Sequence, residues 1–359
     1  MRRIWTLLLA LTLCLTGLIP LKAAAAESNP LVLQSETQNG ITFRYSYDQK
    51  GNCVRKERTN KKEYAEEYSY LFSGIMIRKR VYENGKLKRQ TNYDTKGNAT
   101  SYWLADKTGK LVKETVYTNY YDDFGRISPI FSEDVNSSLN SRGAVRYEYR
   151  DNPDSPDAVV TDAISRYHES YTQTDSDTGE TYYIVSMMQT YDDEGRIIED
   201  RDAVEGRRIL WEYDEQGNVL RKTDMLESYE YASIETSEYE NIYNKKGQLE
   251  EARIHTTVQT DLYGDCETQE YDDVIKYKYD ARGRKISEES CYDSGLTSTE
   301  IWRYDSQGRM TYREYFSGTW DITQTWTYDR YGNLLKTTRD GKVETQYTYV
   351  PLNQALWKK

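Results

Sequence analysis

The chain has 359 residues, and its 48 Lys and Arg against 59 Asp and Glu give a formal net charge of −11. A surface this acidic repels phosphates, so we expect no nucleic-acid partner. Two histidines and four cysteines supply little for histidine-based catalysis or a cysteine metal site, so we predict a protein that is not an enzyme and has no cofactor.

The first 26 residues predict a secretory signal peptide. Arg2 and Arg3 precede an apolar run over residues 5–21, and the alanines of 23–26 form a small-residue cleavage site. Cys14 is a poor lipidation site because a leucine precedes it. No second long apolar run follows, so we expect a secreted, extracellular chain without a membrane span, with association to the cell surface as an alternative.

Tyrosine dominates the aromatic composition. The chain has 35 Tyr against 7 Trp and 5 Phe, while 37% of its residues are hydrophobic and its mean hydropathy is −0.90. Disordered chains are poor in aromatic residues, so this composition argues against disorder. Tyrosine packs on pleated surfaces and keeps its hydroxyl in water, which predicts a tyrosine-rich β-sheet.

A motif of Tyr-Asp/Asn-x-x-Gly and a polar residue recurs along the chain. After a linker at 27–40, the segment 41–350 is predicted to be one β-sheet domain, and 351–359 a C-terminal tail. Weaker relatives are ADKTGK at 105–110 and YENGK at 82–86. The nine full copies begin at Tyr47, Tyr93, Tyr121, Tyr191, Tyr213, Tyr243, Tyr279, Tyr304 and Tyr328.

The motif predicts a hairpin turn. Asp followed by two variable residues and Gly is typical of a type I turn closed by a residue in the left-handed region. In YDDEGR this register places Tyr191 opposite Ile197 and Asp192 opposite Arg196, with the two pairs on opposite faces of the sheet. The turn residues predicted for the later copies are Asp192, Gly195, Asp214, Gly217, Asp280, Gly283, Asp305, Gly308, Asp329 and Gly332.

The same register accounts for the other residues around each turn. The position opposite Asp or Asn is always Asn, Arg or Gln, which can pair with it. The position opposite Tyr is apolar or small in eight of the nine copies. Its occupants are Cys53, Ala99, Ile127, Ile197, Val219, Leu249, Lys285, Met310 and Leu334.

A second set of turns is predicted at the far ends of the strands. Asn84-Gly85 and Asp340-Gly341 are strong signals of two-residue hairpins. Further signals are Glu205-Gly206, Ser294-Gly295 and Ser317-Gly318. Turns at both ends predict an all-β fold, a repetitive antiparallel β-hairpin meander forming one long, twisted or curled sheet, with no helix beyond the signal peptide. Residues 127–185 lack the regular recurrence of the motif. We interpret them as degenerate repeats with long loops, and predict strands near 165–171 and 181–188.

The repeated motif, and above all YDRYGNLLKTTRDGKVETQYTY from Tyr328, resembles the YD-repeat (Rhs, rearrangement-hotspot) family of bacterial surface and secreted proteins. The resemblance covers roughly residues 41–350. It implies long antiparallel sheets and carbohydrate or cell-surface binding, and in large toxins a shell around a C-terminal effector. Because only VPLNQALWKK follows Tyr349, we expect no effector domain, and a chain too short to close a shell around one.

Adjacent carboxylates at Asp122-Asp123, Asp192-Asp193 and Asp272-Asp273 raise the alternative of glycoside hydrolysis. That chemistry needs two carboxyls across one sugar ring, one of them with a raised pKa. Neighbouring strand residues point to opposite faces and turn tips are wet, so we interpret these pairs as solvated turns. DSDTG at 175–179 is similar to part of a calcium loop, but Ser186 stands where the bidentate Glu is needed, which favours a plain hairpin tip.

Strand residues before the turns predict an aromatic stripe on one face, the candidate ligand-binding surface. Its members are Trp211, Tyr213, Tyr277, Tyr279, Trp302, Tyr304, Trp326 and Tyr328. Such rings form either a structural ladder of cross-strand contacts or a platform on which sugar rings stack, and the pattern leaves both open. We predict a secreted, non-catalytic module that binds a glycan or cell-surface polymer. The alternative is a structural or protein-interaction scaffold, or a toxin-related accessory protein without an effector.

Three cysteines remain after removal of the signal peptide, at Cys53, Cys266 and Cys291. An odd number in an oxidising compartment allows at most one internal disulfide. Cys266 with Cys291 is the favoured pair, since about one repeat separates them.

Overall fold

The computed structural model describes residues 30–59, 63–135, 142–149, 164–174, 178–228, 231–318 and 320–357. Within these residues, 24 β-strands form one sheet. Their bounds are β1 (Leu31–Gln38), β2 (Ile41–Tyr47), β3 (Cys53–Arg58), β4 (Tyr64–Tyr70), β5 (Met76–Glu83), β6 (Lys86–Tyr93), β7 (Ala99–Ala105), β8 (Leu111–Tyr121), β9 (Ile127–Asp134), β10 (Arg142–Tyr149), β11 (Ile164–Thr174), β12 (Thr181–Tyr191), β13 (Ile197–Asp202), β14 (Arg207–Tyr213), β15 (Val219–Glu227), β16 (Tyr231–Tyr243), β17 (Leu249–Leu262), β18 (Asp265–Tyr279), β19 (Lys285–Cys291), β20 (Thr297–Tyr304), β21 (Met310–Ser317), β22 (Trp320–Tyr328), β23 (Leu334–Arg339) and β24 (Lys342–Pro351).

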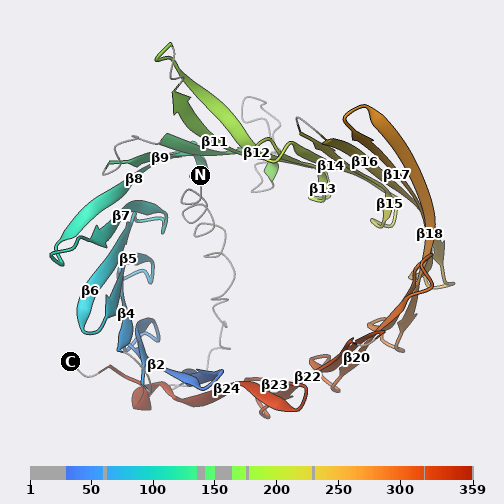
Figure 1. Ribbon diagram of the computed structural model, residues 1–359. Helices are drawn as coiled ribbons and strands as arrows, with labels where there is room; N and C mark the ends of the chain where they lie inside the picture. The colour runs from blue at the N-terminus through green and yellow to red at the C-terminus, as the bar shows by residue number, and fades with distance from the viewer. Residues whose placement is uncertain are drawn as a thin grey trace.

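The sheet closes on itself. Each strand pairs antiparallel with the next, and β24 pairs with β1 from Leu31↔Pro351 to Gln38↔Thr345, so the strands form a ring (Figure 1). The predicted antiparallel meander is confirmed, but the predicted long, twisted or curled sheet is corrected, because the sheet closes into a ring. Strand twist accumulates around the sheet until its first and last strands meet, and their pairing removes both exposed edges.

The strand count sets a minimum width for the ring. Neighbouring strands lie about 4.8 Å apart, so 24 of them give a circumference of about 115 Å and a backbone diameter of about 37 Å before strand tilt widens it. Stacked sheets lie about 10 Å apart, so inward side chains take up about 5 Å on each side. An axial space of roughly 27 Å remains, which is more than the side chains can fill.

All nine motif turns lie at one rim of the ring, which we call the YD rim. Each follows an even-numbered strand, and strands of equal parity run in the same direction. Each motif Gly has a φ between 75° and 94° and donates its N–H to the Asp or Asn carbonyl oxygen at 2.9–3.2 Å. Every motif Tyr pairs with the predicted residue, as in Tyr191↔Ile197. The predicted turn and register are therefore confirmed.

The opposite rim carries the second set of turns. At Asn84-Gly85 and Asp340-Gly341 both residues have positive φ, as a two-residue hairpin requires. ADKTGK follows β7, an odd-numbered strand, so this weak relative of the motif lies on the opposite rim. In the segment 127–185 the described strands β9 to β12 pair in order, and the strands predicted near 165–171 and 181–188 are present. The long loops predicted there fall largely on residues 136–141 and 150–163, outside the described residues.

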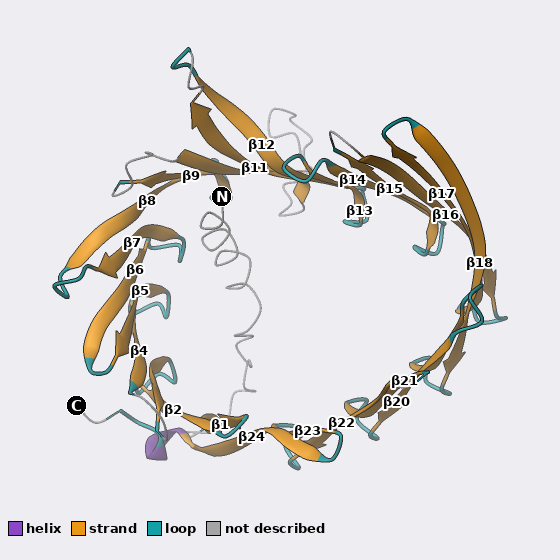
Figure 2. Cartoon of the chain, in the orientation of Figure 1, coloured by secondary structure: helices purple, strands orange, loops and turns teal. Residues whose placement is uncertain are grey.

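Both ends of the described chain take part in closing the ring. Residues 31–38, assigned above to a linker, form β1, which runs into an Asn-Gly turn and pairs with β2 and β24. A 3₁₀ turn, η1 (Leu352–Gln354), follows β24 and is the helical segment beside the seam in Figure 2. Tyr47, Leu352 and Ala355 are buried together there, and the Tyr47 N–H donates to the Ala355 carbonyl oxygen at 3.0 Å.

The sheet is one layer thick. No described side chain is less than 2% exposed, and the buried residues are scattered along the strands. η1 is the one helical element in the described residues, and none of their helices is long and apolar enough to cross a membrane. The stability of the sheet therefore cannot come from a continuous core.

The favoured pair, Cys266 and Cys291, does not form a disulfide. Cys53, Cys266 and Cys291 are all free. Cys291 pairs with Val274 of β18, and Cys266 lies eight residues farther along that strand (274 − 266 = 8). At about 3.4 Å per residue this separates the two cysteines by roughly 27 Å, too far for a disulfide.

We predict that two glycine substitutions separate backbone strain from steric overlap. Gly195→Ala meets nothing within 4 Å, so only its φ of 80° opposes it, a cost of about 1–2 kcal/mol. Gly206→Ala places its Cβ 2.0 Å from the Glu227 carbonyl oxygen and should destabilise the chain clearly more. Chemical denaturation measures both, and equal losses would contradict the described turn after β13.

Candidate interaction surface

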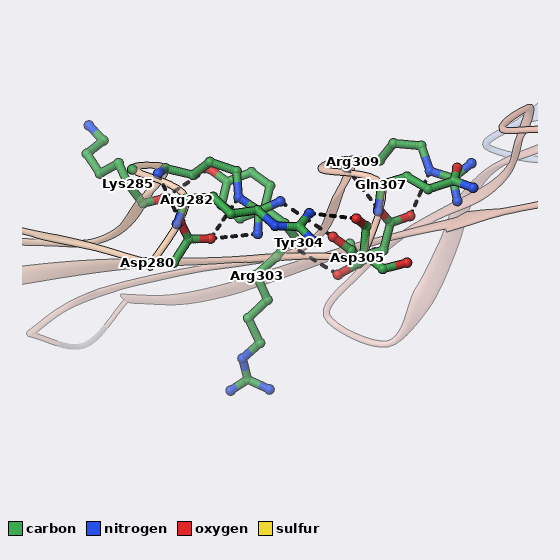
Figure 3. A network of polar contacts seen from close by, with 12 residues as sticks. Asp280, Arg282, Lys285, Arg303, Tyr304, Asp305, Gln307 and Arg309 are labelled. Atoms are coloured by element: carbon green, nitrogen blue, oxygen red, sulfur yellow. Dashed lines mark hydrogen bonds and ion pairs between the residues drawn. The ribbon is translucent and has the colours of Figure 1, made fainter.

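Each motif carboxylate anchors its own turn. Asp280 Oδ1 accepts hydrogen bonds from the Arg282 N–H at 2.9 Å and the Arg284 N–H at 3.0 Å, while Oδ2 accepts from Arg284 Nε at 2.7 Å. The Arg284 side chain accordingly holds the pKa of Asp280 below its usual range. Asp305 and Arg309 repeat the arrangement (Figure 3).

Successive hairpins are tied together by tyrosine hydroxyls. Tyr304 Oη donates to the Lys285 carbonyl oxygen at 3.0 Å. The β19–β20 ladder begins only at Ser287↔Ile301, so this carbonyl lies beyond the ladder and the hydroxyl satisfies it. We call this contact a tyrosine rung. Rungs of 2.7–3.0 Å are Tyr47–Leu33, Tyr70–Cys53, Tyr149–Ile127, Tyr213–Ile197, Tyr279–Leu249, Tyr304–Lys285 and Tyr328–Met310.

Arginine covers the tyrosine ring where the motif ends in Arg. The Arg284 guanidinium, held by Asp280, lies 4.5 Å from the centroid of the Tyr304 ring. The same contact recurs as Arg126–Tyr149, Arg196–Tyr213 and Arg309–Tyr328 at 4.3–4.6 Å. One hairpin thus supplies a guanidinium, held by its own carboxylate, and a carbonyl oxygen to the tyrosine of the next.

Two rungs use asparagine instead. Asn241 Nδ2 donates to the Val219 carbonyl oxygen at 3.0 Å and to Asp214 Oδ2 at 2.9 Å. Tyr243 Oη therefore donates to Asp214 Oδ2 and accepts from Asn218 Nδ2. The same set recurs as Asn119, Ala99, Asp94, Tyr121 and Asn98. An Asn two residues before the motif Tyr, after a copy that ends in Asn, is the sequence signal for this variant.

The two residue pairs of a motif do not stay on separate sides of the sheet at the rim. Each Asp–Arg pair contacts the tyrosine of the following hairpin, whereas strict alternation predicted opposite faces. The cause is an extra residue beyond every turn: Tyr191 pairs with Ile197 but Thr190 with Glu199. This β-bulge turns the chain locally and frees the carbonyl that the rung uses.

The predicted stripe residues lie among cations and polar groups. Trp302 is 9% exposed, and Lys285 Nζ lies 4.7 Å from its ring centroid and 5.4 Å from that of Tyr277. The cross-strand partners of Trp211, Tyr277, Trp302 and Trp326 are Lys222, Glu288, Arg313 and Thr337. In the described part of the chain no two stripe rings pair with each other; the ring pairs there are Phe43–Tyr64, Tyr120–Phe131 and Tyr147–Tyr167.

The candidate acid pairs serve structural contacts. Burial opposes ionisation of Asp192, but hydrogen bonds from the backbone and side chain of Arg196 outweigh it and hold its pKa below the usual range. A general acid needs the reverse shift. Asp272 contacts His255 at 2.9 Å, and Asp273 accepts the Asp293 N–H at 3.0 Å. Residues 175–177 of the calcium-like loop lie outside the described residues, among which no metal-binding cluster is found.

Sequence reasoning missed the most exposed aromatic residues. Phe72 is 91% exposed, Tyr263 75%, Trp320 70% and Tyr331 61%. Phe72 and Tyr331 sit within turns of the YD rim, and Trp320 begins β22 at the opposite rim. The available signal was the aromatic residue inside YDRYGN, at a turn position that usually carries a polar side chain.

Loss of one rung is expected to be measurable. Tyr70→Phe leaves the Cys53 carbonyl without its 2.8 Å hydrogen bond and should lower the free energy of unfolding by about 1 kcal/mol. Tyr120→Phe is the matched control, because Tyr120 is 52% exposed and forms no rung. Equal stabilities of the two variants in urea would contradict a structural role for the rung.

Alkaline pH is expected to loosen the ring. Burial raises the pKa of Tyr70, and likewise of Tyr277, from 10.0 to about 12. Between these values the unfolded chain loses phenolic protons that the folded chain keeps, so stability is complete below pH 10 and falls as the pH rises toward 12. Tyrosinate absorbance should rise at higher pH in the folded chain than in denaturant; coincident titrations would contradict this burial.

The comparisons with known proteins agree with the motif. Residues 191–224, which contain two motif copies, match the RHS Repeat family, and a search of curated proteins finds no match. The crystal structure of TcdB2-TccC3 aligns at 15% identity and a TM-score of 0.36 over 84% of this chain, which spans 16% of that one. A porin-like protein from Bacteroides uniformis ATCC 8492 aligns at 10% identity and 0.20, over 62% and 96% of the two chains. At these scores neither structure bears on function. The RHS match is confined to residues 191–224, and the motif that it covers recurs in seven further copies along the chain.

Proposed function

We propose that this RHS-type protein is a secreted, non-catalytic scaffold that holds a polypeptide partner against the faces of its closed ring. The observation that carries the proposal is a closed sheet one layer thick. Its faces, unlike those of a sandwich, are not covered by a second layer. An accessory role beside a toxin component is one form of this function.

The contacts made by the tyrosines of the aromatic stripe favour a scaffold and not a surface on which sugar rings stack. A sugar ring stacks on an open aromatic face, but Arg196, Arg284 and Arg309 lie over the rings of three motif tyrosines. The hydroxyls of the same tyrosines donate hydrogen bonds to backbone carbonyl oxygens. On the side covered by arginine these rings have no free face, and their hydroxyls are already hydrogen-bonded. This favours a structural role, through contacts with arginine and carbonyl groups and not between stripe rings.

A shallow groove on one sheet face offers a place for such a partner. Arg221, Ile234, Glu238 and His255 line it on β15 to β17. Ile234 is 43% exposed and is surrounded by both signs of charge. A groove of this composition suits a polypeptide with mixed polar and apolar side chains.

Site-specific photo-crosslinking tests the scaffold. A benzophenone amino acid at Ile234 samples the face, and one at Phe72, 91% exposed in a rim turn, is the control. Among proteins secreted by the producing cells, we expect one polypeptide to crosslink from Ile234 and not from Phe72, and to be displaced by unlabelled chain. Identical adducts from both positions, or none from Ile234, would contradict the proposal.

Exposed aromatics at the rims favour glycan binding as a second candidate. Trp320 and Tyr331 keep open ring faces that the stripe lacks, although Arg330 lies 4.6 Å from the Tyr331 centroid. On a glycan array, binding that disappears in Trp320→Ala or Tyr331→Ala would support this candidate. Loss of binding in a folded Trp302→Ala variant would instead identify the stripe as the binding surface. Absence of binding to any glycan on the array would favour the scaffold.

A further inference from the structure

The outer half of β18 is an open sheet edge. β17 and β18 pair from Glu251↔Lys276 to Leu262↔Asp265, whereas the pairing of β18 with β19 begins only at Val274↔Cys291. Among the described residues, 265–273 therefore have a strand on one side alone. At the rim opposite the YD turns, β16 accompanies β17 up to Tyr231↔Leu262, whereas β18 extends beyond β19 (Figure 1).

The turn geometry identifies the free backbone groups. Leu262 and Asp265 flank a two-residue hairpin with positive φ at both central residues, so they form a hydrogen-bonded pair. Odd-numbered residues of β18 then bond to β17, and even-numbered residues face outward. The Asp280 N–H is consistent with this assignment, since this even-numbered residue donates toward β19, to the Arg284 carbonyl oxygen. The outward N–H and C=O groups belong to Cys266, Thr268, Glu270 and Asp272.

This edge lacks most of the usual protection against pairing. Natural edges carry Lys, Pro or bulges, but 265–273 reads DCETQEYDD and its register with β17 has no shift. Its charged side chains are all acidic, five in number: Asp265, Glu267, Glu270, Asp272 and Asp273. A second copy of this edge would bring like charges together, whereas a basic strand would neutralise them.

We propose that the open edge 265–273 binds an extended, lysine- or arginine-rich segment of a partner polypeptide by strand addition. Backbone hydrogen bonds to the four outward residues supply binding without regard to sequence. The carboxylates of Asp265 and Glu267 on one face and Glu270 on the other select basic side chains. The edge is separate from the sheet faces of the proposed scaffold, so either proposal can fail alone.

Three nine-residue peptides test the partner chemistry by fluorescence anisotropy with the full mature chain. The first alternates Lys with Val and Thr, the second replaces each Lys by Glu, and the third is the Lys peptide with N-methylated backbone amides. We expect the first to bind, and the other two to bind at least tenfold more weakly. Failure of the Lys peptide to bind, or equal binding of its N-methylated form, would overturn strand addition.

Variants of the chain locate the site. Thr268→Pro removes an outward N–H without touching the ladder to β17, and Thr268→Val keeps that N–H as the matched control. We expect binding of the Lys peptide to weaken at least tenfold in Thr268→Pro and to persist in Thr268→Val, with unchanged circular dichroism. Equal affinities of the two variants would overturn the proposed edge; if Thr268→Pro does not fold, the N-methylated peptide still decides.

Discussion

Closure between β1 and β24 is the constraint on which the rest of the structure depends. A sheet one layer thick that stayed open would expose two edges, each with a row of unpaired N–H and C=O groups. Pairing of Leu31 with Pro351 through Gln38 with Thr345 removes them, and the C-terminal segment adds a contact at Tyr47. The ring then needs no second layer, and both of its faces can stay polar.

The tyrosine rungs take over part of the role of a core. Each motif turn is followed by a bulge that leaves a carbonyl oxygen outside the ladder. At six turns a tyrosine hydroxyl of the next hairpin bonds to this oxygen, and at two an asparagine does. A phenylalanine would pack but leave the oxygen unpaired, which accounts for tyrosine and not phenylalanine at the rung positions. Where the motif ends in Arg, the guanidinium links its own Asp to the next ring. Stability is thus shared between neighbouring hairpins, as in other repeat proteins.

Local features of this fold were predictable from the sequence, and contacts between hairpins were not. Tyr191 opposite Ile197 follows from turn geometry alone, as does the position of Gly195. The rung from Tyr213 to Ile197 joins different hairpins, and the bulge that frees the carbonyl has no fixed residue signature. Closure depends on the twist summed over all strands, which no local pattern encodes. The segment 31–38 was therefore interpreted as a linker, although it forms the strand that completes the ring. The sequence pattern identified the residues of the stripe. The arginines that lie over its tyrosine rings come from neighbouring hairpins, so only the structure places them there.

A designed disulfide across the seam tests the closed ring most directly. Val32 and Val350 are direct partners in the β1–β24 register, within the Cα distance that a disulfide spans. In a background whose native cysteines are serine, Val32→Cys with Val350→Cys should form an intramolecular disulfide in the dilute monomer, seen by mass spectrometry. Val32→Cys with Leu220→Cys, on β15, should not. Absence of the first disulfide, or its formation only between chains, would contradict closure.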